Sequence, residues 1–157
     1  MYLSVHAAAG VLIGSTITNS WIAFIVGFLS HFFLDMMPHA DANINSKGLN
    51  AKSLRKKYFD KIVALVYLEI CVVTLIVAAL LTNNIHLITG PIVWAVIGSV
   101  LPDILQALSF LRPKNKFLKK FNEFHHLVHY SPEKKISFVL GHVTQLAMLL
   151  LIVNPLI

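Results

Sequence analysis

Hydrophobic positions are grouped along this chain into long runs, and two polar stretches separate them. The apolar blocks extend over about 5–37, 62–81, 86–111 and 136–157. A bilayer core of about 30 Å takes about 20 helical residues, so the first block is too long for one crossing. The polar sequence Thr18-Asn19-Ser20 divides it into segments over about 5–18 and 21–37. The pattern predicts an all-α protein, a polytopic bundle of about five transmembrane or membrane-embedded helices.

The segment over 5–18 is the shortest of the five, about 20 Å long at about 1.5 Å per residue. It contains Gly10 and Gly14, at a spacing that lets two helix backbones approach closely in a membrane. We expect this segment to form a tight hairpin with the segment over 21–37. Since Met1–Val5 contains no Lys or Arg, we also expect the first apolar segment to stay in the mature protein.

The 13 Lys and Arg residues all lie in the two polar stretches, 41–61 and 112–135. Basic residues in short loops stay on the cytoplasmic side of a membrane, and the loop over 82–85 is uncharged. The sequence therefore predicts one multi-pass domain over 1–157 in the cytoplasmic (inner) membrane, with a cytoplasmic N-terminus and cytoplasmic basic loops.

The composition narrows the class of protein further. Only 13% of the residues are charged, against about 25% in an ordinary soluble domain. The net charge of +6 comes from basic residues in the two predicted cytoplasmic loops, where membrane topology already accounts for them. We therefore expect no nucleic-acid partner. A single cysteine, Cys71, provides no disulfide framework.

The stretch over 117–129 is amphipathic, which fits either an interfacial helix among membrane lipids or a solvated loop helix.

Ionisable residues are concentrated toward the cytoplasmic ends of the predicted helices or in the basic loops. Ionisable side chains are costly inside a bilayer and are functional candidates by default. Only His86 falls on the opposite face. The residues at the cytoplasmic level are His6, His31, Asp35, His39, Asp41, Glu69, Asp103, His125, His126, His129 and His142.

Histidine and carboxylate side chains in this cluster suit a divalent metal. His31 and Asp35 are four residues apart, so on a helix they share one face and can either bind one ion or form a structural hydrogen bond. His125 and His129 repeat this spacing and could form a second pair of ligands if the stretch is helical, in which case His126 points away from them. All three histidines also fit a solvated loop. Imidazole with carboxylate suits zinc, with manganese or iron possible, and more than four candidate ligands leave room for one or two ions. Two ions can activate a water and hold a phosphate oxygen.

Three features resemble the YdjM-type family of membrane-bound metal-dependent hydrolases, which is related to zinc-dependent phospholipases C and single-strand nucleases. They are the sequence from Gly27 to Asp41, the Leu101-Pro102-Asp103 step and the early His6. The resemblance implies a helical hydrolase of phosphoester or similar bonds with His and Asp metal ligands. By match it implies that His6, His31, Asp35 and Asp103 are ligands, with His125 and His129 near a further family motif. The order of the two main motifs is the reverse of the order in the family. The sequence from Gly141 to Leu146 resembles a second copy of the His-x-x-x-Asp motif, with Leu146 in place of the carboxylate four residues after His142.

The sequence thus predicts a membrane-bound metal-dependent hydrolase that acts on phosphoester bonds of a lipid or lipid-linked phosphorylated substrate at the cytoplasmic face. Asp35 and Asp103 are the predicted catalytic residues. Two alternatives are a non-catalytic membrane scaffold and a metal- or proton-binding transport protein, which needs ionisable groups across the membrane depth. The predicted metal ligands are His6, His31, Asp35, His39, Asp41, Asp103, His125 and His129.

Overall fold

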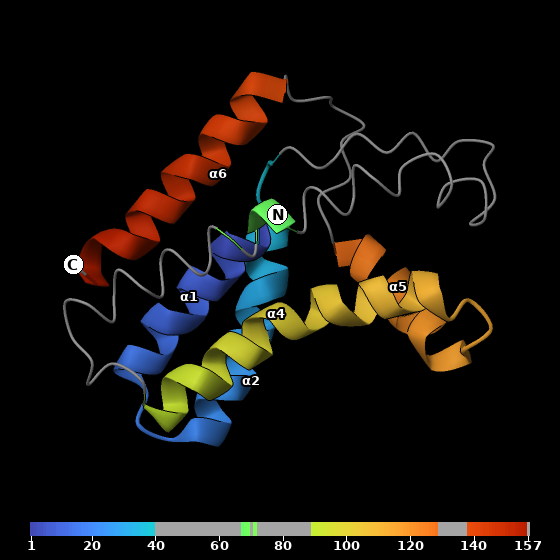
Figure 1. The fold of residues 1–157 in the computed structure, drawn as a ribbon, viewed down its shortest axis with the longest axis horizontal. Helices are drawn as coiled ribbons and strands as arrows, with labels where there is room; N and C mark the ends of the chain where they lie inside the picture. Colours follow the sequence, from blue (N-terminus) through green and yellow to red (C-terminus); the bar gives the residue numbers. More distant parts are fainter. Residues whose placement is uncertain (40–66, 70, 72–88, 129–137, 157) are drawn as a thin grey trace.

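The computed structural model describes residues 1–39, 67–69, 71, 89–128 and 138–156, and these residues form helices and no strands (Figure 1). This confirms the all-α prediction for the described part. The helices are α1 (Leu3–Thr16), α2 (Ser20–Asp35), α4 (Gly90–Leu111), α5 (Lys116–Val128), α6 (Phe138–Val153) and the 3-10 helix η2 (Asn154–Leu156).

Two of the described helical stretches are long and apolar enough to cross a membrane, judged by length and composition. They are Gly90–Ser109 and Val139–Leu156, with 20 and 18 residues. Helices α1 and α2 are apolar but have only 14 and 16 residues. Most of the predicted segment over 62–81 lies outside the described residues, although 67–69 and 71 are helical. The five-span bundle therefore stays a prediction.

The predicted break between the first two segments is confirmed by a local cap. Helix α1 ends at Thr16 and α2 begins at Ser20. The Asn19 side chain accepts hydrogen bonds from the backbone N–H groups of Trp21 (3.0 Å) and Ile22 (3.1 Å). These donors have no partner inside the helix, so the Asn19 side chain specifies where α2 starts.

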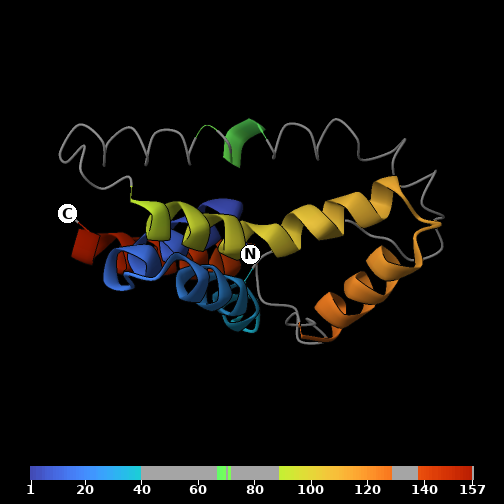
Figure 2. The same cartoon turned by 90° about the horizontal axis from the view of Figure 1, so that it is seen from below.

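The predicted loop over 112–135 contains helix α5, which begins after a similar cap. The Asn115 side chain accepts hydrogen bonds from the backbone N–H groups of Phe117 (3.0 Å) and Leu118 (3.1 Å). Arg112 to Asn115 separate α5 from α4, and α5 folds back under the end of α4 (Figure 2).

Helices α1 and α2 both pack closely on α4, through glycines. A Cβ added at Gly27 of α2 would lie 2.3 Å from the Ala95 carbonyl oxygen of α4. A Cβ at Gly98 of α4 would lie 2.3 Å from the Phe24 carbonyl oxygen of α2. The backbones therefore approach to a separation that only glycine permits at these two positions.

The glycines of α1 correct one expectation. A Cβ at Gly10 would meet Ser99 and Val96, and one at Gly14 would meet Ile92, so both glycines face α4 rather than α2. The small-residue spacing correctly indicated a close helix contact, but it contains no information on which helix is the partner. Sequence neighbours α1 and α2 are joined by a short turn, yet the closest packing of the α1 glycines is with α4.

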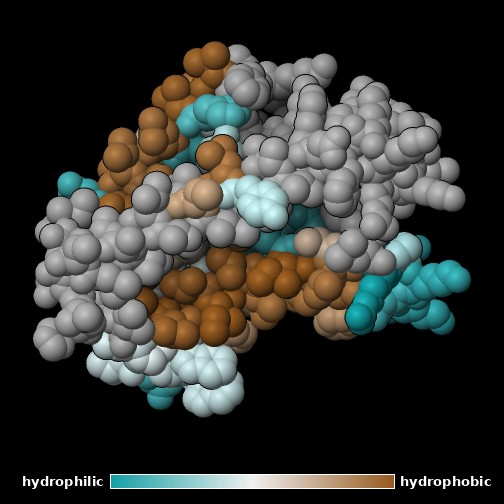
Figure 3. Space-filling view, in the orientation of Figure 1, coloured by the Kyte–Doolittle hydropathy of each residue, from teal (hydrophilic) through white to brown (hydrophobic). Residues whose placement is uncertain are grey.

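The outer sides of the helices are strongly apolar. Large hydrophobic side chains are exposed on α2, α4 and α6, for example Leu29, Phe33, Ile97 and Leu151. The brown surface over α6 and the middle of the bundle gives way to hydrophilic teal at the α5 end (Figure 3). Trp21 and Trp94 stack on each other with ring centroids 5.5 Å apart. In the described part, polar side chains such as His31 and Asp35 are buried beside an apolar core that includes Val5 and Ala95, while many large apolar side chains face outward.

Candidate metal centre

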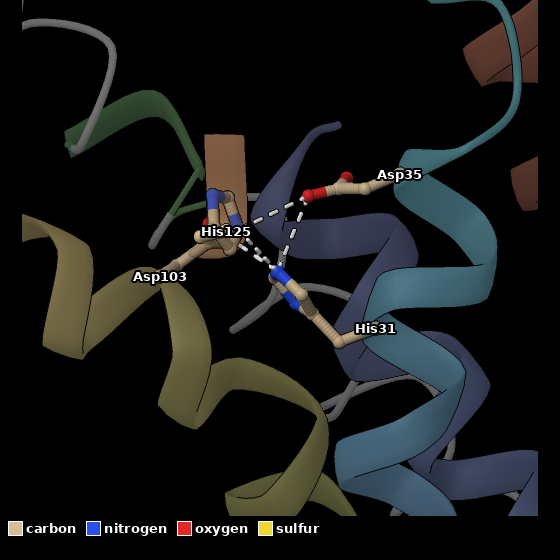
Figure 4. A group of neighbouring side chains, drawn as sticks. All are labelled: His31, Asp35, Asp103 and His125. Atoms are coloured by element: carbon tan, nitrogen blue, oxygen red, sulfur yellow. Dashed lines mark hydrogen bonds and ion pairs between the residues drawn. The ribbon is translucent and has the colours of Figure 1, made fainter. Parts of the chain in front are cut away.

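Three helices bring four predicted ligands together. His31 and Asp35 come from α2, Asp103 comes from α4 and His125 comes from α5 (Figure 4). One ligand atom of each residue lies within 4.8 Å of those of the other three. His31, Asp35 and His125 are at most 1% exposed, whereas the Asp103 side chain is 26% exposed. The group could hold a metal ion, with Asp103 on the side that solvent reaches.

Three of the ligand atoms form a compact triangle. His31 Nε2 lies 3.0 Å from His125 Nε2 and 3.2 Å from Asp35 Oδ2, and the third edge, from His125 Nε2 to Asp35 Oδ2, is 3.3 Å. In tetrahedral zinc sites with bonds of about 2.0–2.1 Å, neighbouring ligand atoms are about 3.3 Å apart. The triangle therefore has the dimensions of one face of such a site. Asp103 Oδ1, 3.8 Å from His31 Nε2, is the fourth candidate.

The tautomer of His31 is determined by its other ring nitrogen. His31 Nδ1 lies 2.9 Å from the backbone carbonyl oxygen of Ser99, which can only accept a hydrogen bond. Nδ1 therefore has the proton, and in the neutral ring Nε2 directs a lone pair toward Asp35 Oδ2. Two acceptors facing each other at 3.2 Å repel unless a cation or a proton lies between them. A hydrogen bond of this kind from the outer nitrogen is usual for metal-binding histidines.

The Ser99 carbonyl lies next to a helix irregularity that the sequence encodes. Pro102 is inside α4 and has no N–H to donate to the Gly98 carbonyl one turn earlier. Helix α4 bends near its middle in Figure 2. Proline is a common cause of such bends. The turn from Gly98 to Asp103 thus supplies both the carbonyl that orients His31 and a carboxylate of the group.

His125 is oriented by Gln106, which the sequence did not single out. Gln106 Nε2 lies 3.3 Å from His125 Nδ1. The two ends of an amide are nearly equivalent in shape, so the same side chain can donate to Nδ1 or, when turned over, accept from it. When the Gln106 oxygen accepts from His125 Nδ1–H, the proton of the neutral ring is on Nδ1. The lone pair of His125 Nε2 is then available to a metal. Ser99, Asp103 and Gln106 follow at helical spacing, and that periodicity is the only sequence signal for Gln106.

The second oxygen of Asp35 is also engaged. Asp35 Oδ1 lies 2.7 Å from the Met1 ammonium group and 3.2 Å from His6 Nε2. The His6 ring stacks on the His31 ring with centroids 4.0 Å apart. His6 is fully buried, and its Nδ1 has no hydrogen-bond partner among the described residues. The structure therefore places His6 directly against the four-residue group, on the Oδ1 side of Asp35.

The remaining predicted ligands lie elsewhere or outside the described residues. His39 is buried and is not part of the group of four; its Nδ1–H donates to the Met37 carbonyl at 2.6 Å. His126 points away from the group, as expected from the spacing, and it is exposed. Asp41 and His129 lie outside the described residues, as does His86.

Two other polar residues have structural contacts near the start of α1. Glu69 Oε2 accepts a hydrogen bond from the Ser4 N–H at 2.9 Å and so satisfies one of the free donors of this helix end. Fully buried Gln145 of α6 accepts from the Tyr2 N–H at 2.8 Å. Burial raises the pKa of the Tyr2 phenol, and the negative charge of the Glu69 carboxylate raises it further. His142 meets the Tyr2 ring edge-on, with centroids 5.7 Å apart.

Comparisons with protein-family models, with curated proteins and with solved structures find no match to this chain.

Proposed function

We propose that this protein is a membrane-bound, metal-dependent hydrolase of the YdjM type, and that it cleaves phosphoester bonds of a lipid or lipid-linked substrate at the cytoplasmic face. The main support is the triangle of His31 Nε2, His125 Nε2 and Asp35 Oδ2. Its edges of 3.0, 3.2 and 3.3 Å match a zinc-ligand face, and the Ser99 carbonyl directs the His31 lone pair into it.

The residues of the chain divide into two roles under this proposal. A divalent ion held at this site would supply an acidified water and would polarise a phosphoryl oxygen. His31, His125 and Asp35 would hold the ion from the buried side, where their burial excludes bulk water. Asp103 faces the open side, where its carboxylate can accept the proton of an attacking water and return it to the leaving oxygen.

The membrane part of the proposal rests on exposed apolar surface and on the position of charge. Two described helical stretches have the length and composition of membrane spans, and the large exposed side chains of α2, α4 and α6 are hydrophobic. All 13 basic residues lie in the two polar stretches, and the five between 112 and 120 lie in or just before α5, the helix that carries His125. Lysines near a bilayer surface attract anionic headgroups at about 1 kcal/mol each, which favours a phosphorylated lipid as substrate.

The proposal is tested by metal analysis and turnover of purified protein. Wild type is expected to contain zinc, manganese or iron in about stoichiometric amount, and His31→Ala and Asp35→Ala are expected to lose it. His142→Ala, a histidine that lies outside the group of four, serves as the control and keeps its metal. Equal, near-zero metal in wild type and in all variants would overturn the site. Retained metal without cleavage of any phosphodiester or phospholipid would instead support a scaffold.

A transport function has less support from the geometry. A proton or ion relay needs ionisable groups along the whole membrane depth. In helices α1, α2 and α4 the ionisable side chains are His6, His31, Asp35 and Asp103, and all four lie in or against the one cluster. Helix α6 adds His142, which lies near its start and contacts the Tyr2 ring. Proton or metal flux through reconstituted protein that is lost in Asp35→Ala would favour transport over hydrolysis.

A further inference from the structure

Helix α5 has two different sides. Leu118 and His125, seven residues apart, are buried against the bundle. The Phe32 ring of α2 lies 5.4 Å from the Phe124 ring and 5.9 Å from the His125 ring, centroid to centroid. Phe124 is also 51% exposed, so it lies at the border between the side of α5 that faces α2 and the exposed side.

A strip of hydrophobic side chains runs along an exposed side of α5. Phe117, Phe124 and Leu127 are 68%, 51% and 84% exposed. Their spacing of seven and three residues places them on one side of the helix. Three large apolar side chains this exposed on one side of a short helix indicate an interaction surface.

Basic residues surround this strip. Arg112, Lys114, Lys116, Lys119 and Lys120 are all exposed, and Glu123 is the only acidic residue between 112 and 128. Lys120 lies between Phe117 and Phe124 on the same side of the helix. Long lysine stems can follow apolar surface while the ammonium groups stay in a polar layer. Aromatic and leucine side chains flanked by lysines are the composition of helices that lie in a bilayer interface.

We propose that the exposed side of α5, defined by Phe117, Phe124 and Leu127, binds the surface of a bilayer that contains anionic phospholipid. The membrane-span candidate Gly90–Ser109 ends seven residues before α5 begins, so α5 is tethered close to one membrane surface. The inference rests on the membrane part of the proposed function but not on metal binding or hydrolysis. A protein partner would need acidic groups to match these lysines, whereas phosphatidylglycerol supplies negative charge and apolar tails together.

Binding to lipid would also affect the candidate metal centre, because α5 carries His125. The bilayer would contact one side of the helix while His125, on the other side, contacts His31 and Asp35. Lipid on the exposed side thus holds the helix that completes the ligand triangle, and a lipid substrate would arrive next to it.

Fluorescence of the full chain in lipid nanodiscs tests this proposal. Exposed Cys71 is replaced by Ser, and an environment-sensitive fluorophore is attached at Leu127→Cys. We expect blue-shifted emission, with quenching by tail-brominated lipid, that is stronger in phosphatidylglycerol discs than in pure phosphatidylcholine discs. The matched control is His126→Cys, because His126 is exposed and lies about 100° around the helix from Leu127 and farther from Phe117 and Phe124, so a label there should stay in water in both lipids.

Charge reversal separates the contribution of the lysines. Lys119→Glu/Lys120→Glu is expected to remove the difference between the two lipids at the Leu127 label while the protein stays in the discs. If the protein enters the discs but this label shows water-like emission in both lipids, the proposed role of α5 is wrong. The membrane part of the proposed function is not affected by that result. Protein that does not enter discs at all would overturn the membrane part of the proposed function as well.

Discussion

The Nε2 atoms of His31 and His125 lie 3.0 Å apart, although the two residues are separated by 94 positions in the chain. His31 Nε2 presents a lone pair because its Nδ1–H donates to the Ser99 carbonyl. Asp35 Oδ2, within 3.3 Å of both nitrogens, contributes negative charge at the same point. A buried arrangement of this kind is stabilised by a shared cation or proton, since bare acceptors would repel one another.

The neighbouring histidines of α5 give a matched pair for metal binding. His125 is 1% exposed and contacts His31 and Asp35, whereas His126 is exposed. We expect His125→Ala to lose most of its bound metal and His126→Ala to keep the wild-type amount, measured by elemental analysis after identical purification. Equal loss in both variants would show that the metal does not depend on the triangle.

Gln106 is expected to set the orientation of the His125 ring. Gln106→Leu removes the partner of His125 Nδ1 and should weaken metal binding by about 10–100-fold, as loss of a supporting hydrogen bond commonly does. Gln106→Glu keeps an oxygen that can accept from Nδ1–H and should restore most of the affinity. Titration with a competing chelator measures both variants. If the Glu variant binds metal as weakly as the Leu variant, Gln106 has only a packing role.

Asp103 is expected to contribute more to turnover than to retention of metal. It is the most exposed of the four residues, and its Oδ1 lies 3.8 Å from His31 Nε2. Asp103→Asn keeps the size of the side chain but removes the proton acceptor, so kcat should fall by about 100-fold or more while metal is retained. A variant with full activity on a phosphodiester substrate would exclude Asp103 from proton transfer.

Gly27 is expected to be intolerant of the smallest side chain. A Cβ there would lie 2.3 Å from the Ala95 carbonyl oxygen, so α2 and α4 must separate. Alanine normally favours a helix over glycine by up to about 1 kcal/mol, but overpacking costs about 1–3 kcal/mol and should dominate. Thermal unfolding in detergent is therefore expected to show a lower Tm for Gly27→Ala. Gly90→Ala is the control, because its Cβ would meet only the movable Ser20 side chain, at 3.2 Å.

Local sequence determined the helices and the direction of side chains on each of them. The polar interruption at Thr18-Asn19-Ser20 predicted the break between α1 and α2, because Asn19 caps α2. The four-residue spacing of His31 and Asp35 predicted a shared face, and their nearest side-chain atoms are 3.2 Å apart. Helical periodicity also turns His125 and His126 in different directions, although packing decides that His125 is the buried one.

Only the tertiary structure decided which side chains from different helices meet. Periodicity places a residue on one side of its own helix but says nothing about which helix packs there. The close approach of Gly10 to α4, and the arrival of His125 from α5, depend on how the helices cross one another and on the bend in α4, the helix that contains Pro102. Ser99 and Gln106 are uncharged and resemble any polar helix residue in the sequence. They acquire a role only because His31 and His125, far away along the chain, are folded against them.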